Sequence, residues 1–199
     1  MPVNKKNEIV CVFGQSGTGK SSWVQQHLKG LSRFVLWDTL DEYSGFSRFE
    51  DFESVYALLN KHHLRGLFQV TFVCIEEDEE GALETMCELV MAVENLFFIV
   101  EEVDMFATPQ SIPFEFRRLI KTGRHYGVNM IFVSQRPAMV NRLLTAQSRR
   151  FILFRTKEES DIRFLRAHVG EAADLVPDLP DMHFIDYNHG QIERGEIKW

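Results

Sequence analysis

The sequence has few cysteines and no long hydrophobic run, and each shortage excludes a class of protein. The three cysteines, Cys11, Cys74 and Cys87, are odd in number and lack C-x-x-C spacing. They argue against a disulfide framework and favour reduced core residues in an intracellular protein. The longest obvious apolar runs, such as residues 96–100, are far shorter than the roughly 20 residues that a membrane helix needs. The sequence therefore predicts no transmembrane segment, and we also expect no signal peptide.

The length and composition indicate a folded protein. The chain has 199 residues, of which 45% are hydrophobic and 26% are charged. A chain of this size buries about 70% of its unfolded surface, which excludes disorder as the dominant state. No repeat, low-complexity tract or linker divides the sequence, so we expect a single domain over residues 1–199. Its core would span about residues 8–156, with a helix and a hairpin over 157–199.

Short apolar runs alternate with longer helical patterns, which is typical of an α/β protein with a mainly parallel sheet. The expected strands are residues 9–13, 34–38, 68–74, 96–101, 129–134, 150–155, 182–186 and 191–197. The expected helices are residues 20–29, 52–59, 79–93, 114–122, 138–144 and 157–169. The last two strands flank Asn188-His189-Gly190, which is a hairpin signal. The sequence therefore predicts a mainly parallel sheet flanked by helices, with a C-terminal β-hairpin.

A glycine-rich segment directly follows the first expected strand. Residues 14–21, Gly-Gln-Ser-Gly-Thr-Gly-Lys-Ser, fit the phosphate-loop (Walker A) pattern G-x-x-x-x-G-K-[ST] at every position, between a strand and a helix as the motif requires. Backbone N–H groups of such a loop and the helix N-terminus bind phosphate. Lys20 would reach the β and γ phosphates, and Ser21 would bind Mg²⁺. The expected nucleotide-binding residues are Gly14, Gln15, Ser16, Gly17, Thr18, Gly19, Lys20, Ser21 and Ser22.

Two adjacent carboxylates end the strand at residues 96–101, in the position of a Walker B motif. Glu101 would hold Mg²⁺ through water, and Glu102 would orient the attacking water. The metal carboxylate is usually Asp, so the division of roles between the two glutamates stays open. A small-molecule kinase does not need the second carboxylate, since its substrate is the acceptor. The pair therefore favours ATP hydrolysis by a RecA-like (ASCE) P-loop NTPase.

A polar amide, Gln135, ends the strand at residues 129–134. An amide at the tip of a central strand is able to hydrogen-bond the γ-phosphate or the attacking water. By itself the residue is equally consistent with a strand-end cap. Following a phosphate loop and a double-carboxylate strand, it is the expected third catalytic element.

These residues resemble the HerA–FtsK branch of P-loop ATPases, whose members pump or unwind DNA as rings. The match rests on the phosphate loop at 14–21, on Val-Leu-Trp-Asp-Thr-Leu-Asp-Glu-Tyr at 35–43 and on the metal strand at 97–104. The most telling block is Gly-Arg-His-Tyr-Gly at 123–127, leading into Ile-Phe-Val-Ser-Gln-Arg-Pro at 131–137. The similarity spans roughly residues 9–155. It implies that the strand ending in Gln135 lies between the phosphate-loop strand and the metal strand.

The small size makes the chain most similar to the compact genome-packaging ATPases of membrane-containing, double-jelly-roll viruses and prophages. The resemblance implies a homo-oligomeric ring, hexameric or pentameric, that moves double-stranded DNA without sequence specificity. It also implies a location in the host cytoplasm or on the virion, with capsid or membrane proteins of a virion as partners. ATP and Mg²⁺ would be the cofactors.

By the same resemblance, Arg124 is the first candidate for an arginine finger that reaches a neighbour's γ-phosphate, and such a residue speeds phosphoryl transfer by about 10³–10⁵-fold. Arg149 and Arg150 are the runners-up. Asp38 and Glu42 correspond to the acidic residues of the family's second strand, near the nucleotide or the subunit interface. A cap at the strand end explains Asp38 almost as well.

The charge is unevenly distributed along the chain. The formal net charge of −7 argues at first against a nucleic-acid partner. However, residues 117–166 hold twelve Lys or Arg and three acidic residues, a net charge of +9, which leaves −16 for the remainder. This segment contains Arg124, Arg149 and Arg150. Such separation favours a basic surface that meets nucleotide, a neighbouring subunit or DNA phosphates.

Three alternatives stay open from the sequence. A HerA-like ATPase of DNA processing or conjugation would carry the same blocks. A P-loop small-molecule kinase would carry the phosphate loop, but the double glutamate and the Gln-Arg-Pro block argue against it. A nucleotide-gated assembly protein that touches no DNA is the third alternative.

Overall fold

A computed structural model describes residues 8–62 and 66–198 of the chain. The strands are β1 (Ile9–Phe13), β2 (Arg33–Trp37), β3 (Ser47–Phe49), β4 (Phe68–Phe72), β5 (Phe97–Val100), β6 (Asn129–Ser134), β7 (Arg150–Phe154), β8 (His183–Asn188) and β9 (Gln191–Glu196). The α-helices are α1 (Lys20–Lys29), α2 (Phe52–His62), α3 (Glu79–Val93), α4 (Phe114–Thr122), α5 (Arg142–Gln147) and α6 (Glu159–Val169). Short 3-10 helices are η1 (Val103–Met105), η2 (Gly123–Tyr126), η3 (Pro137–Met139) and η4 (Gly170–Asp178).

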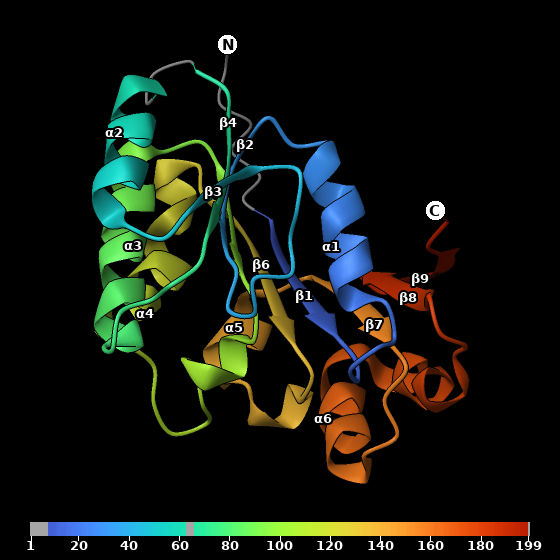
Figure 1. Ribbon diagram of the computed structural model, residues 1–199. Helices are drawn as coiled ribbons and strands as arrows, with labels where there is room; N and C mark the ends of the chain where they lie inside the picture. Colours follow the sequence, from blue (N-terminus) through green and yellow to red (C-terminus); the bar gives the residue numbers. More distant parts are fainter. Residues whose placement is uncertain (1–7, 63–65, 199) are drawn as a thin grey trace.

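These strands form a nine-stranded sheet in the order β3-β4-β2-β5-β6-β1-β7-β8-β9. The pairs from β3 to β7 are parallel, and the β7–β8 and β8–β9 pairs are antiparallel. The predicted fold class, a mainly parallel sheet with a C-terminal hairpin, is therefore confirmed (Figure 1). β6 lies between β5 and β1, which is the arrangement that the family resemblance implies.

Helices cover both faces of the sheet, because the central strands are apolar on both sides. One face of β1 contributes Ile9, Cys11 and Phe13 to a large core that includes residues of α2 to α6. The other face contributes Val10 and Val12 to a smaller core that is packed against α1. Figure 1 shows α1 on the opposite side of the sheet from α2, α3 and α4. Helix α1, which follows the phosphate loop, thus forms a layer of its own over the central strands.

Several predicted elements are found with bounds shifted by one to three residues; for example, the helix predicted over 52–59 extends to His62. One predicted helix is wrong, and one strand was missed. The helix predicted over 138–144 is wrong: η3 is followed by a break at Asn141, and α5 begins only at Arg142. The Asn141 side chain accepts a hydrogen bond from Leu143 N (3.0 Å) and donates one to Thr108 O (2.7 Å), so it caps a new helix. The helix predicted from 157 begins at Glu159. The short strand β3 has no apolar pattern of its own, and it pairs only with β4.

The C-terminal hairpin extends the sheet and reaches back to the phosphate loop. His189 and Gly190 both have positive φ angles (50° and 86°), as a tight two-residue hairpin turn requires. At the other end of the hairpin, Met182 N donates to Thr18 O at 2.9 Å. Among the described residues, no helix has the length and apolar character needed to cross a membrane.

Candidate nucleotide-binding site

The carboxyl ends of the central parallel strands meet at one edge of the sheet. Phe13 at the end of β1 lies opposite Ser134 at the end of β6, and Trp37 at the end of β2 lies opposite Val100 at the end of β5. The phosphate loop, the two glutamates and Gln135 each follow one of these strand ends directly. Three segments that are far apart in the sequence therefore come together, at the edge where open α/β sheets bind ligands.

The phosphate loop is anchored to the ends of β6 and β7, the two strands that flank β1. Gly14 N donates to Ser134 O (3.4 Å), and Gln15 N donates to Arg155 O (2.9 Å). Only glycine fits at position 14, because a Cβ there would lie 2.5 Å from the Cβ of Phe154. Gly17 has a φ of +74°, which L-residues rarely adopt. The sequence pattern is therefore required by a close approach at one glycine and by the turn at another.

Lys20 is the first residue of α1 and is 7% exposed. Its Nζ donates to Gln15 O at 3.1 Å, so the side chain folds back over the loop. Burial lowers the pKa of Lys20, and nearby carboxylates, led by Glu101 and Glu102, act in the opposite direction. A buried ammonium at a helix N-terminus, above a curled loop, is a site for a polyanion.

Glu101 is the buried acid of the site, with 7% of its surface exposed. The Tyr43 hydroxyl donates a hydrogen bond to its Oε1. Burial raises the pKa of Glu101 to about 7, while the Tyr43 hydrogen bond and the charge of Lys20 lower it. Glu101 N also donates to Trp37 O (3.1 Å), which fixes the backbone at the end of β5.

Glu102 turns away from the strand and faces β6. Its backbone is left-handed (φ 46°, ψ 46°), a costly conformation for a residue with a Cβ. This turn brings its Oε1 into a hydrogen bond with Gln135 Nε2. The two side chains that were predicted to act on the attacking water are therefore neighbours. Their catalytic roles stay predictions.

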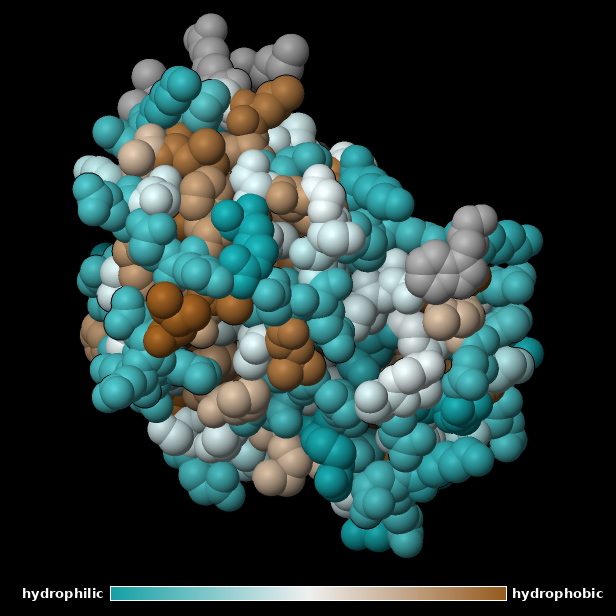
Figure 2. Space-filling view, viewed as in Figure 1, coloured by the Kyte–Doolittle hydropathy of each residue, from teal (hydrophilic) through white to brown (hydrophobic). Residues whose placement is uncertain are grey.

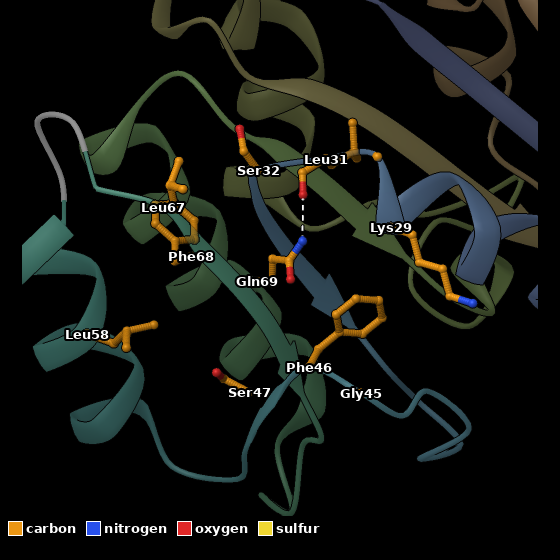
Figure 3. A pocket seen from close by; sticks show the side chains of 11 residues that line it. Lys29, Leu31, Ser32, Gly45, Phe46, Ser47, Leu58, Leu67, Phe68 and Gln69 are labelled. Carbon is orange, nitrogen blue, oxygen red and sulfur yellow. Dashed lines mark hydrogen bonds between the residues drawn. The ribbon is translucent and has the colours of Figure 1, made fainter.

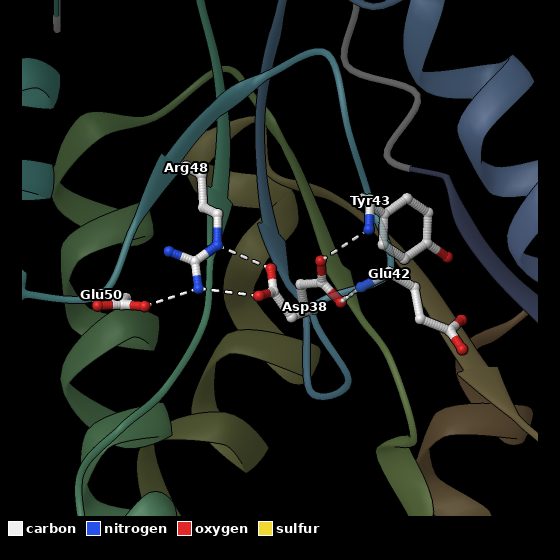
Figure 4. A network of polar contacts seen from close by, with 6 residues as sticks. Asp38, Glu42, Tyr43, Arg48 and Glu50 are labelled. Atoms are coloured by element: carbon white, nitrogen blue, oxygen red, sulfur yellow. Dashed lines mark hydrogen bonds and ion pairs between the residues drawn. The ribbon is translucent and has the colours of Figure 1, made fainter.

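The loop between β2 and β3 brings a further set of side chains to the same edge (Figure 4). The carboxylate of Asp38, 1% exposed, accepts hydrogen bonds from Glu42 N (3.1 Å) and Tyr43 N (3.0 Å). Burial raises the pKa of Asp38, and these two N–H groups lower it. Folded in this way, the loop places Glu42 Oε2 3.0 Å from the Ser21 hydroxyl, which donates to it. Asp38 thus fixes the backbone of its loop, and Glu42 contacts Ser21 of α1.

The oxygen donors at this edge fit Mg²⁺. Ser21 supplies a hydroxyl, and Glu101, Glu102 and Glu42 supply carboxylates around Lys20. No cluster of three or more His, Cys, Asp or Glu that would hold a metal occurs in the described part of the chain. Mg²⁺ is usually bound through one or two carboxylates together with substrate phosphates, so such a cluster is not needed. Ser21 and Glu101 stay the predicted ligands.

Sequence reasoning missed two residues of this edge. Tyr43, 5% exposed, belongs to the Glu-Tyr pair of the resemblance, and the sequence assigned it no contact with Glu101. Asp104 lies in η1 close enough to influence the pKa of Lys20. Its Oδ1 is buried with no hydrogen-bond partner among the described residues. An acid two positions after Glu102 was the available signal for Asp104.

The predicted arginine finger lies at the opposite edge of the sheet. Arg124 is in η2, just before β6 begins, whereas Gln135 follows the end of β6. Six strand residues at about 3.3 Å each separate them by roughly 20 Å. Its side chain is exposed, with Nε 3.5 Å from His125 Nε2. Arg124 is therefore too far away to serve the phosphate loop of its own chain.

The two runners-up differ from each other. Arg150, at the start of β7, forms ion pairs with Asp186 (2.7 Å) and Glu8 (3.2 Å). These pairs give Arg150 a structural contact within the chain. Arg149 is exposed and forms no ion pair with the described residues. Between the two, only Arg149 keeps a free guanidinium.

Half of the cations in the +9 segment are neutralised within the chain. Six of the twelve form ion pairs: Arg118, Arg136, Arg150, Arg155, Arg163 and Arg166. The other six form none with the described residues: Arg117, Lys121, Arg124, Arg142, Arg149 and Lys157. Arg117, Lys121 and Arg124 are exposed and follow one another at spacings of four and three along α4 and η2. That spacing places Arg117 and Lys121 on one face of α4, and Arg124 follows them in η2.

A separate cavity lies away from this edge (Figure 3). It has a volume of about 740 Å³ and is lined near the start of β4 by Leu67, Phe68 and Gln69 and from the other side by Phe46. Gln69 Nε2 donates to Leu31 O across it at 2.7 Å. Figure 2 shows that apolar groups on this face of the molecule form small separate patches among hydrophilic ones. The cluster of charged side chains around Lys20 lies at the phosphate loop and not at this cavity.

The chain shows limited similarity to curated proteins, and no family model matches it. It is 26% identical over 142 residues to protein P9 of Pseudoalteromonas phage PM2, covering 68% of this chain and 63% of that protein. It is 33% identical over 114 residues to a probable helicase of Methanocaldococcus jannaschii, covering 54% of this chain and 22% of that protein. The chain therefore spans less than two thirds of the length of these curated relatives.

Solved structures resemble the chain over nearly its whole length. The genome packaging NTPase B204 of Sulfolobus turreted icosahedral virus 2, in complex with ATP-gammaS, matches with a TM-score of 0.78 and 20% identity, over 98% of this chain and 100% of that one. The chain therefore has the same fold as B204. VirB4 of Thermoanaerobacter pseudethanolicus matches with a TM-score of 0.61 and 12% identity, over 98% and 90% of the two chains. At these identities the likeness confirms the predicted resemblance at the level of the fold.

Proposed function

We propose that this chain is a Mg²⁺-dependent ATPase that moves double-stranded DNA as a homo-oligomeric ring, and that it packages a viral or prophage genome. The observation that carries the proposal is the convergence of the phosphate loop, Glu101, Glu102 and Gln135 at one edge of a sheet. The fold is that of the genome-packaging NTPase B204, which was solved with ATP-gammaS and AMPPCP. Such a motor would act in the host cytoplasm and at the virion.

The proposed roles follow from where each side chain lies. The N–H groups of the loop and Lys20 would bind the phosphates and offset their charge. Ser21 and Glu101 would hold Mg²⁺, which supplies charge neutralisation for the transferred phosphoryl group. Glu102, oriented by Gln135, would accept a hydrogen bond from the attacking water and draw off its proton. Gln135 would also hydrogen-bond the γ-phosphate, so that β6 would respond to the presence of this phosphate.

The Glu102–Gln135 contact favours hydrolysis over transfer to a small molecule. A kinase uses its substrate as the acceptor and has no use for a second carboxylate that is held by an amide beside the loop. Here the left-handed turn at Glu102 carries an energetic cost, and it aims the side chain at Gln135. Positions that carry such strain are often functional.

The distance of Arg124 from its own phosphate loop favours an assembly in which subunits complete one another's sites. The free cations of α4 and η2 end at Arg124, and acids surround Lys20 at the opposite edge. In a head-to-tail ring, the basic edge of one subunit would meet the acidic edge of the next. Such a heterologous interface closes when the rotation between subunits fits a ring.

ATP hydrolysis with and without double-stranded DNA tests this proposal. We expect DNA to stimulate the wild type. Lys20→Ala should lose nucleotide binding, and Glu102→Gln should bind ATP but hydrolyse it about 10²–10⁴-fold more slowly. Hydrolysis that ignores DNA, but responds to a small acceptor molecule, would contradict the proposal and favour a kinase.

DNA processing by a HerA-like ATPase is a second candidate function. The similarity to a probable helicase favours it. Both functions require DNA-stimulated hydrolysis, and packaging in addition requires a capsid. Filling of purified empty capsids in the presence of ATP would distinguish them.

A further inference from the structure

The loop between β2 and β3 bonds to both elements that carry the predicted Mg²⁺ ligands. The hydroxyl of Tyr43 in this loop donates a hydrogen bond to the Glu101 carboxylate. The carboxylate of Glu42, in the same loop, accepts a hydrogen bond from the Ser21 hydroxyl. Thr39 Oγ1 donates to the main-chain oxygen of Glu101 at 3.1 Å, which is a further link to the same residue. A third segment of chain thus connects the start of α1 with the end of β5.

We propose that Tyr43 is a positioning residue, which holds the Glu101 carboxylate so that it and the Ser21 hydroxyl are set to bind one Mg²⁺. This inference rests on the proposed function of the site. The second contact of the loop, from Glu42 to Ser21, sets the hydroxyl in the same way. Groups that hydrogen-bond metal ligands orient them, and their loss typically lowers metal affinity by about 10–100-fold.

Packing keeps Tyr43 in place. Its ring is buried in the smaller core, together with Trp23 and Val24 of α1 and Phe34 of β2. Asp38 accepts hydrogen bonds from the N–H groups of both Glu42 and Tyr43, which fixes the backbone on either side of the Glu42 Cα. Because the ring is held rigidly, the position of its hydroxyl oxygen is fixed, and that position is within hydrogen-bond reach of Glu101.

The chemistry of the phenol agrees with this role. Its hydroxyl is a donor, and it donates to Oε1 of the Glu101 carboxylate. A donor to one carboxylate oxygen leaves the other oxygen free for a metal or for its water.

The outer part of the loop is held by ion pairs and by a hydrogen bond from Gln25 Nε2 to Ser44 O (2.8 Å). Arg48 Nε and Nη2 bind Asp41 at 2.7 and 2.9 Å, and Nη2 also binds Glu50 at 2.6 Å (Figure 4). These groups are about half exposed, so the ion pairs contribute little stability. The positioning effect therefore depends on the buried part of the loop, at Asp38 and Tyr43.

The Mg²⁺ dependence of nucleotide binding tests this inference. Binding of a fluorescent ADP analogue is measured at increasing Mg²⁺ and in EDTA, for wild type, Tyr43→Phe and Tyr56→Phe. Tyr56 is a matched control because it lies on α2 and is 58% exposed. We expect Tyr43→Phe to require about 10-fold more Mg²⁺ for half-saturation, with unchanged affinity in EDTA, and Tyr56→Phe to match wild type.

A parallel pair of variants tests the other contact of the loop and covers the case in which Tyr43→Phe does not fold. Glu42 is exposed, so its replacement leaves the core intact. Glu42→Ala removes the acceptor of the Ser21 hydroxyl and should raise the Mg²⁺ requirement. Glu42→Gln keeps an acceptor oxygen for the Ser21 hydroxyl and should raise the Mg²⁺ requirement less than Glu42→Ala does.

Two results would overturn the inference. One is a Tyr43→Phe variant with the same Mg²⁺ dependence as wild type. The other is an equal loss of affinity with and without Mg²⁺, which is what a purely structural tyrosine would give. A wild-type protein that shows no Mg²⁺-dependent nucleotide binding would instead contradict the proposed function itself.

Discussion

Glu101 carries a buried charge whose free-energy cost depends on pH. Burial raises its pKa from 4.5 to about 7, so between these values the folded protein binds more protons than the unfolded chain. Stability therefore falls as pH rises through this window, and the loss is complete above the folded pKa. At about 1.4 kcal/mol per pKa unit, the full effect is on the order of 3 kcal/mol.

This cost predicts that Glu101→Gln stabilises the protein at neutral and alkaline pH. Without nucleotide and Mg²⁺, we expect the variant to be about 1–3 kcal/mol more stable than wild type at pH 8. The difference should shrink towards pH 5, where wild-type Glu101 is neutral when folded. Urea unfolding at several pH values measures it.

Glu193→Gln is the control for this prediction, because Glu193 is exposed on β9. Its stability should follow that of wild type across the same pH range. If Glu101→Gln also ran parallel to wild type from pH 5 to pH 8, the buried charge would not be the cause. The pKa of Glu101 in the folded protein would then lie close to its value in the unfolded chain.

At the scale of elements, the phosphate loop depends on two glycines for different reasons. An Ala side chain at position 14 would meet the Phe154 Cβ at 2.5 Å, and β7 would have to move. At position 17 nothing lies within 4 Å, and only the φ of +74° opposes a side chain. We expect Gly14→Ala to destabilise by about 3 kcal/mol and Gly17→Ala by about 1 kcal/mol. Chemical unfolding of both variants measures these losses. Equal losses of stability would contradict the close approach of Phe154 to position 14.

Helix α4 carries two free cations, Arg117 and Lys121, and we expect them to contact DNA phosphates and Arg124 beyond them to reach the neighbouring subunit. Each neutralised phosphate contributes about 0.9 to the slope of log affinity against log salt concentration. Arg117→Gln combined with Lys121→Gln should therefore weaken DNA binding and lower that slope by about 2. Lys29→Gln combined with Lys61→Gln removes two exposed cations outside the +9 segment and should leave the slope unchanged. Equal slopes for both double variants would place the DNA elsewhere.

Much of the fold and site could be predicted from the sequence, because parallel strands bring their ends together. A phosphate loop, a double glutamate and a glutamine, each after an apolar run, had to share one edge. What could not be predicted depends on contacts between distant segments. Tyr43 reaches Glu101 across 58 positions, and Asn141 divides a predicted helix by binding Thr108. No local pattern encodes either contact.

At the scale of the whole molecule, the Arg124 of one subunit and the Glu102 of its neighbour would act on the same nucleotide. Arg124→Ala alone should lower ATP turnover by roughly 10³-fold or more, and Glu102→Gln alone should also be nearly inactive. In a mixture, some interfaces would join an intact Arg124 to an intact Glu102, so part of the activity should return. Sedimentation under the same conditions reports whether a ring is present. A monomeric profile without rescue would contradict the ring.

The net charge of −7 gives a misleading picture of the molecule as a whole. Acids surround Lys20 at one edge, while free cations follow α4 to Arg124 at the other. Six further cations of the +9 segment are used within the fold. The protein therefore presents free cations on one surface although its net charge is negative.

The most direct test of the central claim is ATP-driven displacement of a third strand from double-stranded DNA. A motor that moves along the duplex removes the third strand without reading its sequence. We expect wild type to displace it only with ATP and Mg²⁺, and Glu102→Gln to bind the DNA but leave the triplex intact. ATP hydrolysis by wild type that proceeds at full rate while the triplex stays intact would contradict DNA translocation.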